Sequence, residues 1–377
     1  MNFSLTEDQE LLRRSERELL ASEWPSAAMR RMLDDSGSAS HQFWLKISET
    51  GWPALMIPEE YGGLGSGAYD LALLMEEMGR RLVPGTFLST AVLAAGALQR
   101  MGNEEARRNY LPGIAEGRVK ATLAVYAPNS GWDLGALRTS GGTDGQVTNG
   151  GNDGPVTDDG NEGPVTKSFV PDAAAADLII CVLREGDDVR LVVPHDPKIT
   201  ALETLDPTRA LADVTFDPAE AETIGEGAID ALQRTIDIAT VALAAEMVGG
   251  AAELLEVTVA YVKARRQFGR PVGSFQAVQH RAADMLISLE KARSAVYYAA
   301  IAADEQPERL ALASSMAKVA ANKAYRFASQ QAIQLHGGIG FTWEQDLHFY
   351  LKRAKASEFS LGSTAWHAER IAAQLGF

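Results

Sequence analysis

The stretch Gln334-Leu-His-Gly-Gly-Ile-Gly-Phe-Thr-Trp-Glu344 places three glycines within four residues, directly after a long helical pattern. A single glycine after a helix is commonly a C-cap, because glycine adopts the left-handed conformation without steric cost, and this explains Gly337 taken alone. Three glycines beside Gln334 indicate in addition that the backbone comes close to a ligand. The stretch is therefore a candidate binding segment at the end of a helix.

A second stretch, Arg265-Arg-Gln-Phe-Gly-Arg-Pro-Val-Gly-Ser-Phe-Gln276, lies between two further helical patterns. It brings guanidinium, amide and aromatic groups to a place where two helix ends meet. Such a corner suits a dinucleotide, because arginine binds phosphate, an aromatic ring stacks and an amide reaches a ring edge. Charge alone favours a plainer interpretation, in which the basic residues between 263 and 270 form a solvated helix end.

The two stretches belong to the last third of a chain that has three textures. Residues 1–117 alternate helical periodicity with short loops, and residues 118–225 contain short β-branched segments separated by Gly, Asp and Pro. Residues 226–377 return to long helical patterns, whose short links make the helices antiparallel neighbours. The sequence therefore predicts an α+β protein with an N-terminal α-helical domain, a middle β-barrel or sheet domain and a C-terminal four-helix-bundle domain.

A nine-residue repeat lies within the middle region. Val147-Thr-Asn-Gly-Gly-Asn-Asp-Gly-Pro155 is followed by Val156-Thr-Asp-Asp-Gly-Asn-Glu-Gly-Pro164. Two copies are too few for a solenoid. The Asn-Gly and Asp-Gly turn signals favour an extended acidic hairpin or a mobile loop over residues 147–165. The spacing of Asp and Asn is not that of a known calcium loop, so no metal site is expected.

Composition limits the class of protein. The 377 residues are 46% hydrophobic and 23% charged, as in soluble globular proteins, and no apolar run reaches the length of a membrane span. A formal net charge of −15 disfavours a broad nucleic-acid or anionic-membrane surface. The N-terminus lacks the pattern of a secretory signal, and the single cysteine, Cys181, cannot form an internal disulfide. Together these features predict a cytoplasmic location.

Taken together, the two stretches resemble the acyl-CoA dehydrogenase family, and the resemblance extends over the whole chain. It includes an N-terminal FSLTEDQ opening, an IPEEYGGLG loop, the RRQFGRPVGSFQ arm and the run QLHGGIGFTWEQDLHFYLKRAK. Members of this family are typically tetramers that hold FAD at a subunit interface. A glutamate takes the α-proton of an acyl-CoA thioester, and the β-hydride passes to flavin N5. The resemblance thus implies FAD as cofactor, acyl-CoA as substrate and an electron-transfer flavoprotein as partner.

The half of the family's flavin site that reaches into a neighbouring subunit is retained. By the match, the reaching residues come from both stretches: Arg265, Gln267, Phe268, Gln334, Gly337 and Gly338. The first three are implied to contact FAD that is bound mainly to a neighbouring chain. The last three are implied to lie along its adenosine-pyrophosphate portion.

The half that receives FAD departs from the family pattern. Where the family has Thr-Glu-Pro-x-x-Gly-Ser-Asp, the chain has Tyr126-Ala-Pro-Asn-Ser-Gly-Trp-Asp133. The larger Tyr126 and Trp132 thus replace a Thr that binds flavin and a Ser on the CoA side. Where the family has Trp-Ile-Thr under the flavin, the chain has Phe169-Val-Pro171. Pro171 offers neither a hydroxyl nor a backbone N–H to flavin N5, so three contacts are weakened together.

The catalytic base of the family is absent at both positions where members carry it. Alignment on Arg353-Ala-Lys355 places Leu361-Gly-Ser363 where most members have Glu-Gly-Thr. A leucine cannot accept a proton. A minority of members carry the glutamate on the first long helix of the bundle, and this chain has Ala239 there. The resemblance therefore implies that the chain has no catalytic residue of the usual kind.

Other side chains are weak alternatives for the base. Glu246 shares the helical face of Ala239 but lies about 10 Å further along the axis, beyond hydrogen-bond reach. It is otherwise a buried or interfacial acid. Asp237 points to roughly the opposite side of the helix. His367 follows the broken turn and its residue type titrates near neutrality, but packing or solvent exposure is the favoured interpretation.

A retained reaching half and a missing base lead to one main hypothesis. The chain is expected to be the base-lacking subunit of a heteromeric acyl-CoA dehydrogenase of α2β2 type, whose partner carries the glutamate and the main flavin floor. Heteromeric members are associated with bulky acyl-CoA such as steroid side-chain thioesters. Three alternatives stay open: a self-sufficient homotetramer with a relocated base, a flavin monooxygenase of the same fold, and a flavin-free binding or scaffold protein.

Overall fold

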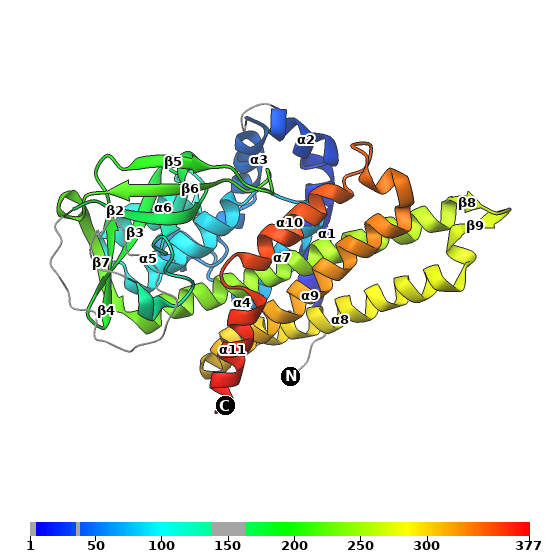
Figure 1. Cartoon of the computed structure of the whole chain (residues 1–377). Helices are drawn as coiled ribbons and strands as arrows, with labels where there is room; N and C mark the ends of the chain where they lie inside the picture. The colour runs from blue at the N-terminus through cyan, green and yellow to red at the C-terminus, as the bar shows by residue number, and fades with distance from the viewer. Residues whose placement is uncertain (1–4, 35–37, 138–162) are drawn as a thin grey trace.

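The computed structural model describes residues 5–34, 38–137 and 163–377, and it has three parts in chain order (Figure 1). Helices form the first part, two β-sheets the second and long helices the third, so the predicted α+β fold class is confirmed. The expected boundary at 117/118 lies between the last helix of the first part and the first strand. The expected boundary at 225/226 lies inside strand β7. Residues 147–162 of the predicted hairpin lie outside the described residues.

The N-terminal part begins with a well-capped helix, α1. The Thr6 side chain accepts a hydrogen bond from the Gln9 backbone N–H, and the Gln9 side chain accepts one from the Thr6 N–H. This reciprocal capping satisfies two free donors of the first turn. The helical elements of this part are α1 (Glu7–Glu23), α2 (Ser26–Asp34), α3 (Ser38–Glu49), α4 (Ala68–Arg80), the π-helical segment η3 (Leu88–Ala94), α5 (Ala95–Met101) and α6 (Glu104–Ala115).

The middle part consists of two sheets with strand orders β1-β3-β4-β7 and β2-β6-β5. A cluster of buried side chains from both sheets, including Ile179, Val192 and Phe216, forms its core. Cys181 is buried in this cluster, as its apolar sequence neighbours predict. The strands are β1 (Ala121–Ala124), β2 (Val165–Pro171), β3 (Leu178–Glu185), β4 (Asp188–Val193), β5 (Lys198–Leu202), β6 (Leu211–Phe216) and β7 (Glu222–Ala228).

The C-terminal part is built from long helices and a small hairpin. Its most apolar helix, α7, could cross a membrane by length and composition, but 89% of its most apolar window is buried inside the protein, as in the core helix of a soluble fold. The elements are α7 (Ile229–Ala264), β8 (Arg266–Gln267), β9 (Arg270–Pro271), α8 (Gln276–Glu305), α9 (Leu310–His336), the 3-10 turn η9 (Gly337–Phe341), α10 (Leu347–Phe359) and α11 (Thr364–Gln374).

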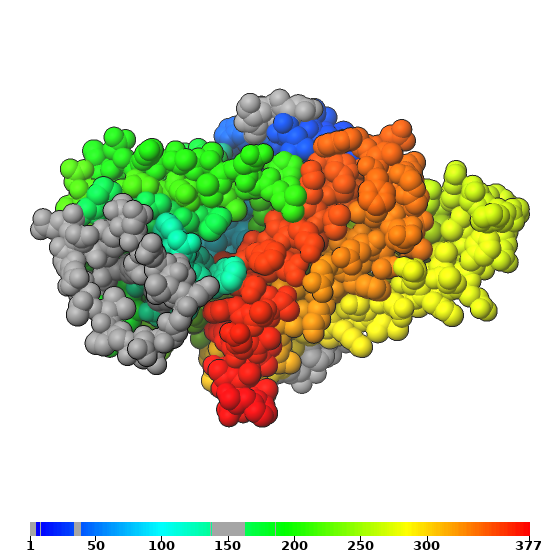
Figure 2. All heavy atoms as spheres, in the orientation of Figure 1, coloured from blue at the N-terminus to red at the C-terminus, as the bar shows by residue number. Residues whose placement is uncertain are grey.

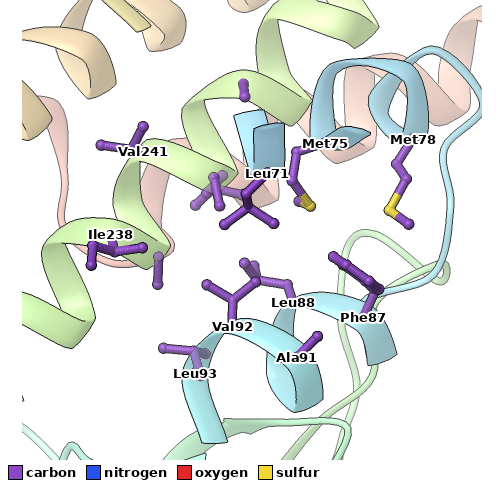
Figure 3. Close-up of a cluster of buried hydrophobic side chains, with 14 of the residues drawn as sticks. Leu71, Met75, Met78, Phe87, Leu88, Ala91, Val92, Leu93, Ile238 and Val241 are labelled. Carbon is purple, nitrogen blue, oxygen red and sulfur yellow. The ribbon is translucent and has the colours of Figure 1, made fainter. Parts of the chain in front are cut away.

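The N-terminal and C-terminal parts share one hydrophobic core, in which α4 and η3 pack on α7 (Figure 3). Side chains such as Met75, Val92 and Ile238 meet there. Glycines allow the closest approach of α4 and α7, because a Cβ on Gly79 would lie 1.9 Å from the carbonyl oxygen of Glu246. The parts are therefore fixed to each other, whereas the β8–β9 end of the C-terminal helices projects beyond the rest (Figures 1 and 2).

Candidate functional site

The arm predicted from residues 265–276 is a small hairpin at the projecting end of α7 and α8 (Figure 1). Phe268 and Gly269 form its tip with φ values of 51° and 79°, the left-handed pair that a two-residue hairpin turn requires. The Phe268 side chain is 91% exposed, and Arg265 and Gln267 are exposed as well. The structure thus presents all three predicted contact residues on the surface.

The glycine-rich stretch lies where α9 ends and η9 begins. Gly337 has φ 66° and ψ −142°, a conformation that is open almost only to glycine. A Cβ on Gly338 would meet nothing within 4 Å, whereas one on Gly340 would lie 2.8 Å from the Ile333 carbonyl oxygen. Packing therefore explains glycine at 340 but not at 338. An exposed, uncrowded backbone at 337 and 338 suits close approach of a ligand, and Gln334 is exposed beside it.

One aromatic pair joins the end of α9 to the end of α7. The Tyr261 ring stacks on His336 with centroids 4.2 Å apart, and the Tyr261 hydroxyl donates to the His336 carbonyl oxygen over 3.3 Å. Tyr261 lies one helical turn before Arg265, and His336 directly precedes Gly337. The structure therefore brings the two predicted binding stretches together at the same end of the bundle.

The segments that the sequence assigns to the receiving half also lie together, in the middle part. The Ser168 N–H donates to the Tyr126 carbonyl oxygen over 2.8 Å. The register of β2 shifts between Lys167 and Val170. One of the two residues in this bulge, Phe169, has φ 55° and is 66% exposed. The bulge turns an aromatic side chain outward, but next to it Pro171 has no N–H and no hydroxyl to offer.

Tyr126 faces the C-terminal helices. Its ring packs against the core that these helices share with the N-terminal part. Burial raises the pKa of Tyr126, as does the nearby Asp237 carboxylate, while Arg370 acts in the opposite direction. The phenol is therefore a neutral group that packs between the middle part and the bundle. Trp132 in the same loop is half-buried.

The turn between α10 and α11 has an ordered backbone although no carboxylate stands at its tip. Leu361 has φ 56° and Gly362 has φ 113°, and the Leu361 side chain packs against the main core. A Cβ at 362 would lie 2.6 Å from the His367 ring, which explains the glycine. Ser363 caps α11 by accepting a hydrogen bond from the Trp366 N–H over 3.2 Å.

A buried lysine and a buried histidine hold this turn. Lys318 of α9 donates from Nζ to the carbonyl oxygens of Ser357 over 2.7 Å and Gly362 over 3.3 Å. Burial lowers the pKa of Lys318 to about 7. His367 lies with Nε2 3.0 Å from the Leu361 carbonyl oxygen, and its other ring nitrogen lies 3.1 Å from the Ser315 hydroxyl.

His367 is unsuited to act as a base. Burial and the nearby Lys318 cation lower its pKa to about 3, and both ring nitrogens are hydrogen-bonded. The histidine is therefore a neutral packing group at neutral pH, which agrees with the plainer of the two interpretations given by the sequence.

Glu246 lies in a buried ion network rather than in an open site. It is 5% exposed, and its two carboxylate oxygens accept hydrogen bonds from Arg209 and Arg353. Burial alone would raise the pKa of Glu246, but the two arginines outweigh it and hold the pKa below its usual value. A carboxylate with a lowered pKa and two arginine partners is a poor proton acceptor.

The remaining positions considered for the base do not replace it. Ala239 is fully buried. Asp237 forms a two-pronged pair with Arg370, with distances of 2.5 and 2.7 Å, and this pair fastens α11 to α7. Glu246 and Asp237, the two carboxylates considered as replacements for the base, are thus both engaged in ion pairs.

Lys318 and Arg353 hold the site together, although no motif in the sequence marks either residue. Arg353 is 1% exposed and donates to Asp206, Glu246 and the Val83 carbonyl oxygen, which belong to different parts of the chain. Lys318 stands on a buried helical face, where Ala317 and Ala321 lie beside it together with the polar Ser315 and Asn322. That pattern, a lysine on a buried helical face, was the available signal.

Three comparisons with known proteins relate the chain to one family. A profile of the acyl-CoA dehydrogenase C-terminal domain matches residues 225–376, and one of the N-terminal domain matches residues 6–118. The acyl-CoA dehydrogenase IpdE2 of Mycolicibacterium smegmatis is 32% identical over 372 residues, which cover 98% of this chain and all of the relative.

Among solved structures, one chain of the Tcur3481-Tcur3483 steroid ACAD is 27% identical with a TM-score of 0.81, covering 98% of both chains. The ChsE4-ChsE5 complex from Mycobacterium tuberculosis supplies a chain that is 24% identical with a TM-score of 0.82, covering all of this chain and 99% of that one. The second likeness concerns the fold alone.

Proposed function

The chain belongs to the acyl-CoA dehydrogenase family, and from that membership we propose that it is the base-lacking subunit of a heteromeric, FAD-dependent member. In this proposal a partner subunit provides the catalytic glutamate and the main flavin floor. This chain contributes its projecting hairpin and glycine-rich stretch to the partner's flavin site. The complex desaturates an acyl-CoA thioester between the α and β carbons.

The observation that carries the proposal is the turn at Leu361. The turn keeps an ordered backbone, a buried lysine and a capped following helix, yet its tip bears an aliphatic side chain. The other family position, Ala239, has no proton acceptor either, and Glu246 is held by Arg209 and Arg353. Proton abstraction requires an acceptor within hydrogen-bond reach of the α carbon, so we infer that the base comes from the partner.

The residues at the projecting end fit a dinucleotide such as FAD. Arg265 and Gln267 are exposed donors, Phe268 is an exposed ring, and the backbone at Gly338 has no neighbour that a Cβ would meet. When bound, FAD accepts the β-hydride of the substrate. In this proposal Arg265 binds its phosphates, Phe268 covers an aromatic face, and Gly338 lets the backbone come close.

The receiving half supports the same division of labour. Pro171 lacks the N–H and hydroxyl that would hold a flavin over β2, and the half-buried Tyr126 and Trp132 take up space in the loop beside it. The strand that would lie under the flavin has a bulge at Phe169, but Pro171 brings no hydrogen-bonding group to it. We infer that this chain contributes more to its partner's flavin site than to its own.

For the substrate we propose a bulky acyl-CoA, such as a steroid side-chain thioester, and for the electron acceptor an electron-transfer flavoprotein. The support is the 27% identity to a chain of the Tcur3481-Tcur3483 steroid ACAD. We further propose a cytoplasmic location.

Purification of the chain alone and together with candidate partner subunits tests the proposal. Bound flavin and acyl-CoA oxidation are measured for each preparation. The proposal predicts no turnover by the lone chain and full turnover by the complex.

Robust turnover by the lone chain would contradict it and would favour a self-sufficient enzyme. In that case the Glu246→Gln variant separates two causes: a true base loses orders of magnitude in rate, whereas a structural acid mainly loses stability.

A further inference from the structure

The basic residues of the hairpin are not equivalent. The Arg266 side chain donates to the Gly269 carbonyl oxygen over 3.1 Å, within the hairpin itself. The Arg270 guanidinium lies over the Phe275 ring, with Cζ 4.0 Å from the ring centroid. Arg265 forms no side-chain hydrogen bond or ion pair within the described part of the chain. Only one of the three guanidiniums is therefore fully available to an anion.

Phe275 connects the hairpin to the helix that carries it. It stands at the N-cap position of α8 and is half-buried. Its ring meets the Phe268 ring edge-on, with centroids 6.2 Å apart and planes at 90°. Arg270 covers the same ring from the hairpin's second strand. The ring thus contacts both the tip and the second strand of the hairpin.

The backbone alone gives this hairpin little support. The two strands pair only at Arg266 with Pro271 and at Gln267 with Arg270, and a two-residue pairing of this kind is marginal in water. The closing bond, from the Val272 N–H to the Arg265 carbonyl oxygen at 2.8 Å, lies at the base and leaves the tip free. Side-chain contacts must therefore fix the direction of the tip.

We propose that Arg270 and Phe275 form a brace that holds the hairpin in its flavin-binding conformation, so that Arg270 is a positioning residue and Arg265 the phosphate ligand. The proposal rests on the proposed function, because the brace has value only if the hairpin binds FAD. A flexible tip loses conformational entropy when it binds FAD, and this loss weakens binding. A braced tip has lost that entropy before binding, so its affinity for FAD is higher without any new contact.

A double-mutant cycle in the flavin-binding complex tests the brace. FAD is titrated into the flavin-stripped complex that contains wild-type chain, Arg270→Gln, Phe275→Leu or both substitutions. Each single substitution is expected to raise the FAD dissociation constant about two- to fivefold, the range of an exposed cation–π contact. The double variant is expected to show no more than the larger single effect, since either change alone removes the brace.

The proposal is wrong if the double variant raises the FAD dissociation constant by the product of the two single effects. That result is expected if Arg270 binds phosphate directly. Absence of any effect of Arg270→Gln would overturn it too. Lys263→Gln is the matched control, because Lys263 is equally exposed and loses the same charge but has no ring partner. Its dissociation constant is expected to match that of the wild type within twofold.

Amide hydrogen exchange of residues 266–270, measured without FAD, gives a second readout. Faster exchange in both single variants supports the brace, and unchanged exchange contradicts it. The Arg265→Gln variant separates the brace from the function on which it rests. If this variant binds FAD as tightly as the wild type, the proposed role of the hairpin is wrong, and the exchange experiment still decides whether the brace exists.

Discussion

The hairpin end of the C-terminal helices and the turn between α10 and α11 differ in what surrounds them. At the hairpin, Phe268 is 91% exposed and Arg265 has no partner within the described residues. At the turn, Leu361 packs on the core while Lys318 and His367 bind its carbonyl oxygens. The first region keeps exposed binding groups that only a small side-chain contact, Arg270 on Phe275, supports. The second region keeps buried support without a reactive group. This difference suits a chain that completes a partner's site.

The largest effect is expected on the supported side of the comparison, at Arg353. The Arg353→Met change leaves Asp206 and Glu246 buried without this guanidinium, so the free energy of unfolding should fall by about 3–5 kcal/mol. Urea denaturation measures it. Arg326→Met is the control, because that arginine is 48% exposed in its pair with Glu358 and should cost within about 1 kcal/mol. Equal effects would contradict the assigned role.

A smaller loss is expected at Lys318, which holds the turn. The Lys318→Met change removes the donor to the Ser357 and Gly362 carbonyl oxygens and should cost about 1–3 kcal/mol. Amide exchange should rise in residues 357–367 beyond what global destabilisation produces. Lys323→Met changes an exposed lysine on the same helix and should stay within about 0.5 kcal/mol. A uniform rise in exchange over the chain would mean that Lys318 does not hold the turn in particular.

The turn should also be sensitive to acid. The folded pKa of His367 is about 3, below the ordinary 6.5, so between these values the unfolded chain binds more protons than the folded one. Stability is therefore full above pH 6.5 and falls as pH decreases toward 3, by up to about 1.4 kcal/mol per pH unit from this group. His367→Gln should flatten that slope, and the exposed His280→Gln should not. Identical slopes in both variants would contradict the assignment.

The smallest effect on stability is expected at the hairpin. Phe268→Ser should change the free energy of unfolding by no more than about 0.5 kcal/mol, because the ring is 91% exposed. The same change should weaken flavin binding by the complex by about 1 kcal/mol, the worth of an aromatic contact. Thermal unfolding and FAD titration measure the two quantities. A loss of stability without a loss of flavin binding would mean that Phe268 supports the fold and does not bind flavin.

The sequence predicted what depends on local pattern and on motif. The α+β order, the helix end at Gly337 and the place of residues 265–276 between two helices follow from periodicity and glycine, and each is present in the structure. The hairpin that these residues form was not predicted. The partners of Glu246 could not be read in this way. Arg353 lies 107 residues away along the chain, and only the folded arrangement brings the two together. The support of the Leu361 turn by Lys318 likewise depends on the packing of α9 against α10.

Anaerobic mixing of flavin-loaded protein with excess acyl-CoA shows whether the catalytic base lies in this chain or in a partner subunit. Flavin reduction is followed in a single turnover, once with the lone chain and once with the reconstituted complex. No reduction by the lone chain is expected, because no proton acceptor stands at Leu361 or Ala239, whereas the complex should be reduced rapidly. Rapid reduction by the lone chain that is lost in the Glu246→Gln variant would contradict it and would identify Glu246 as the base.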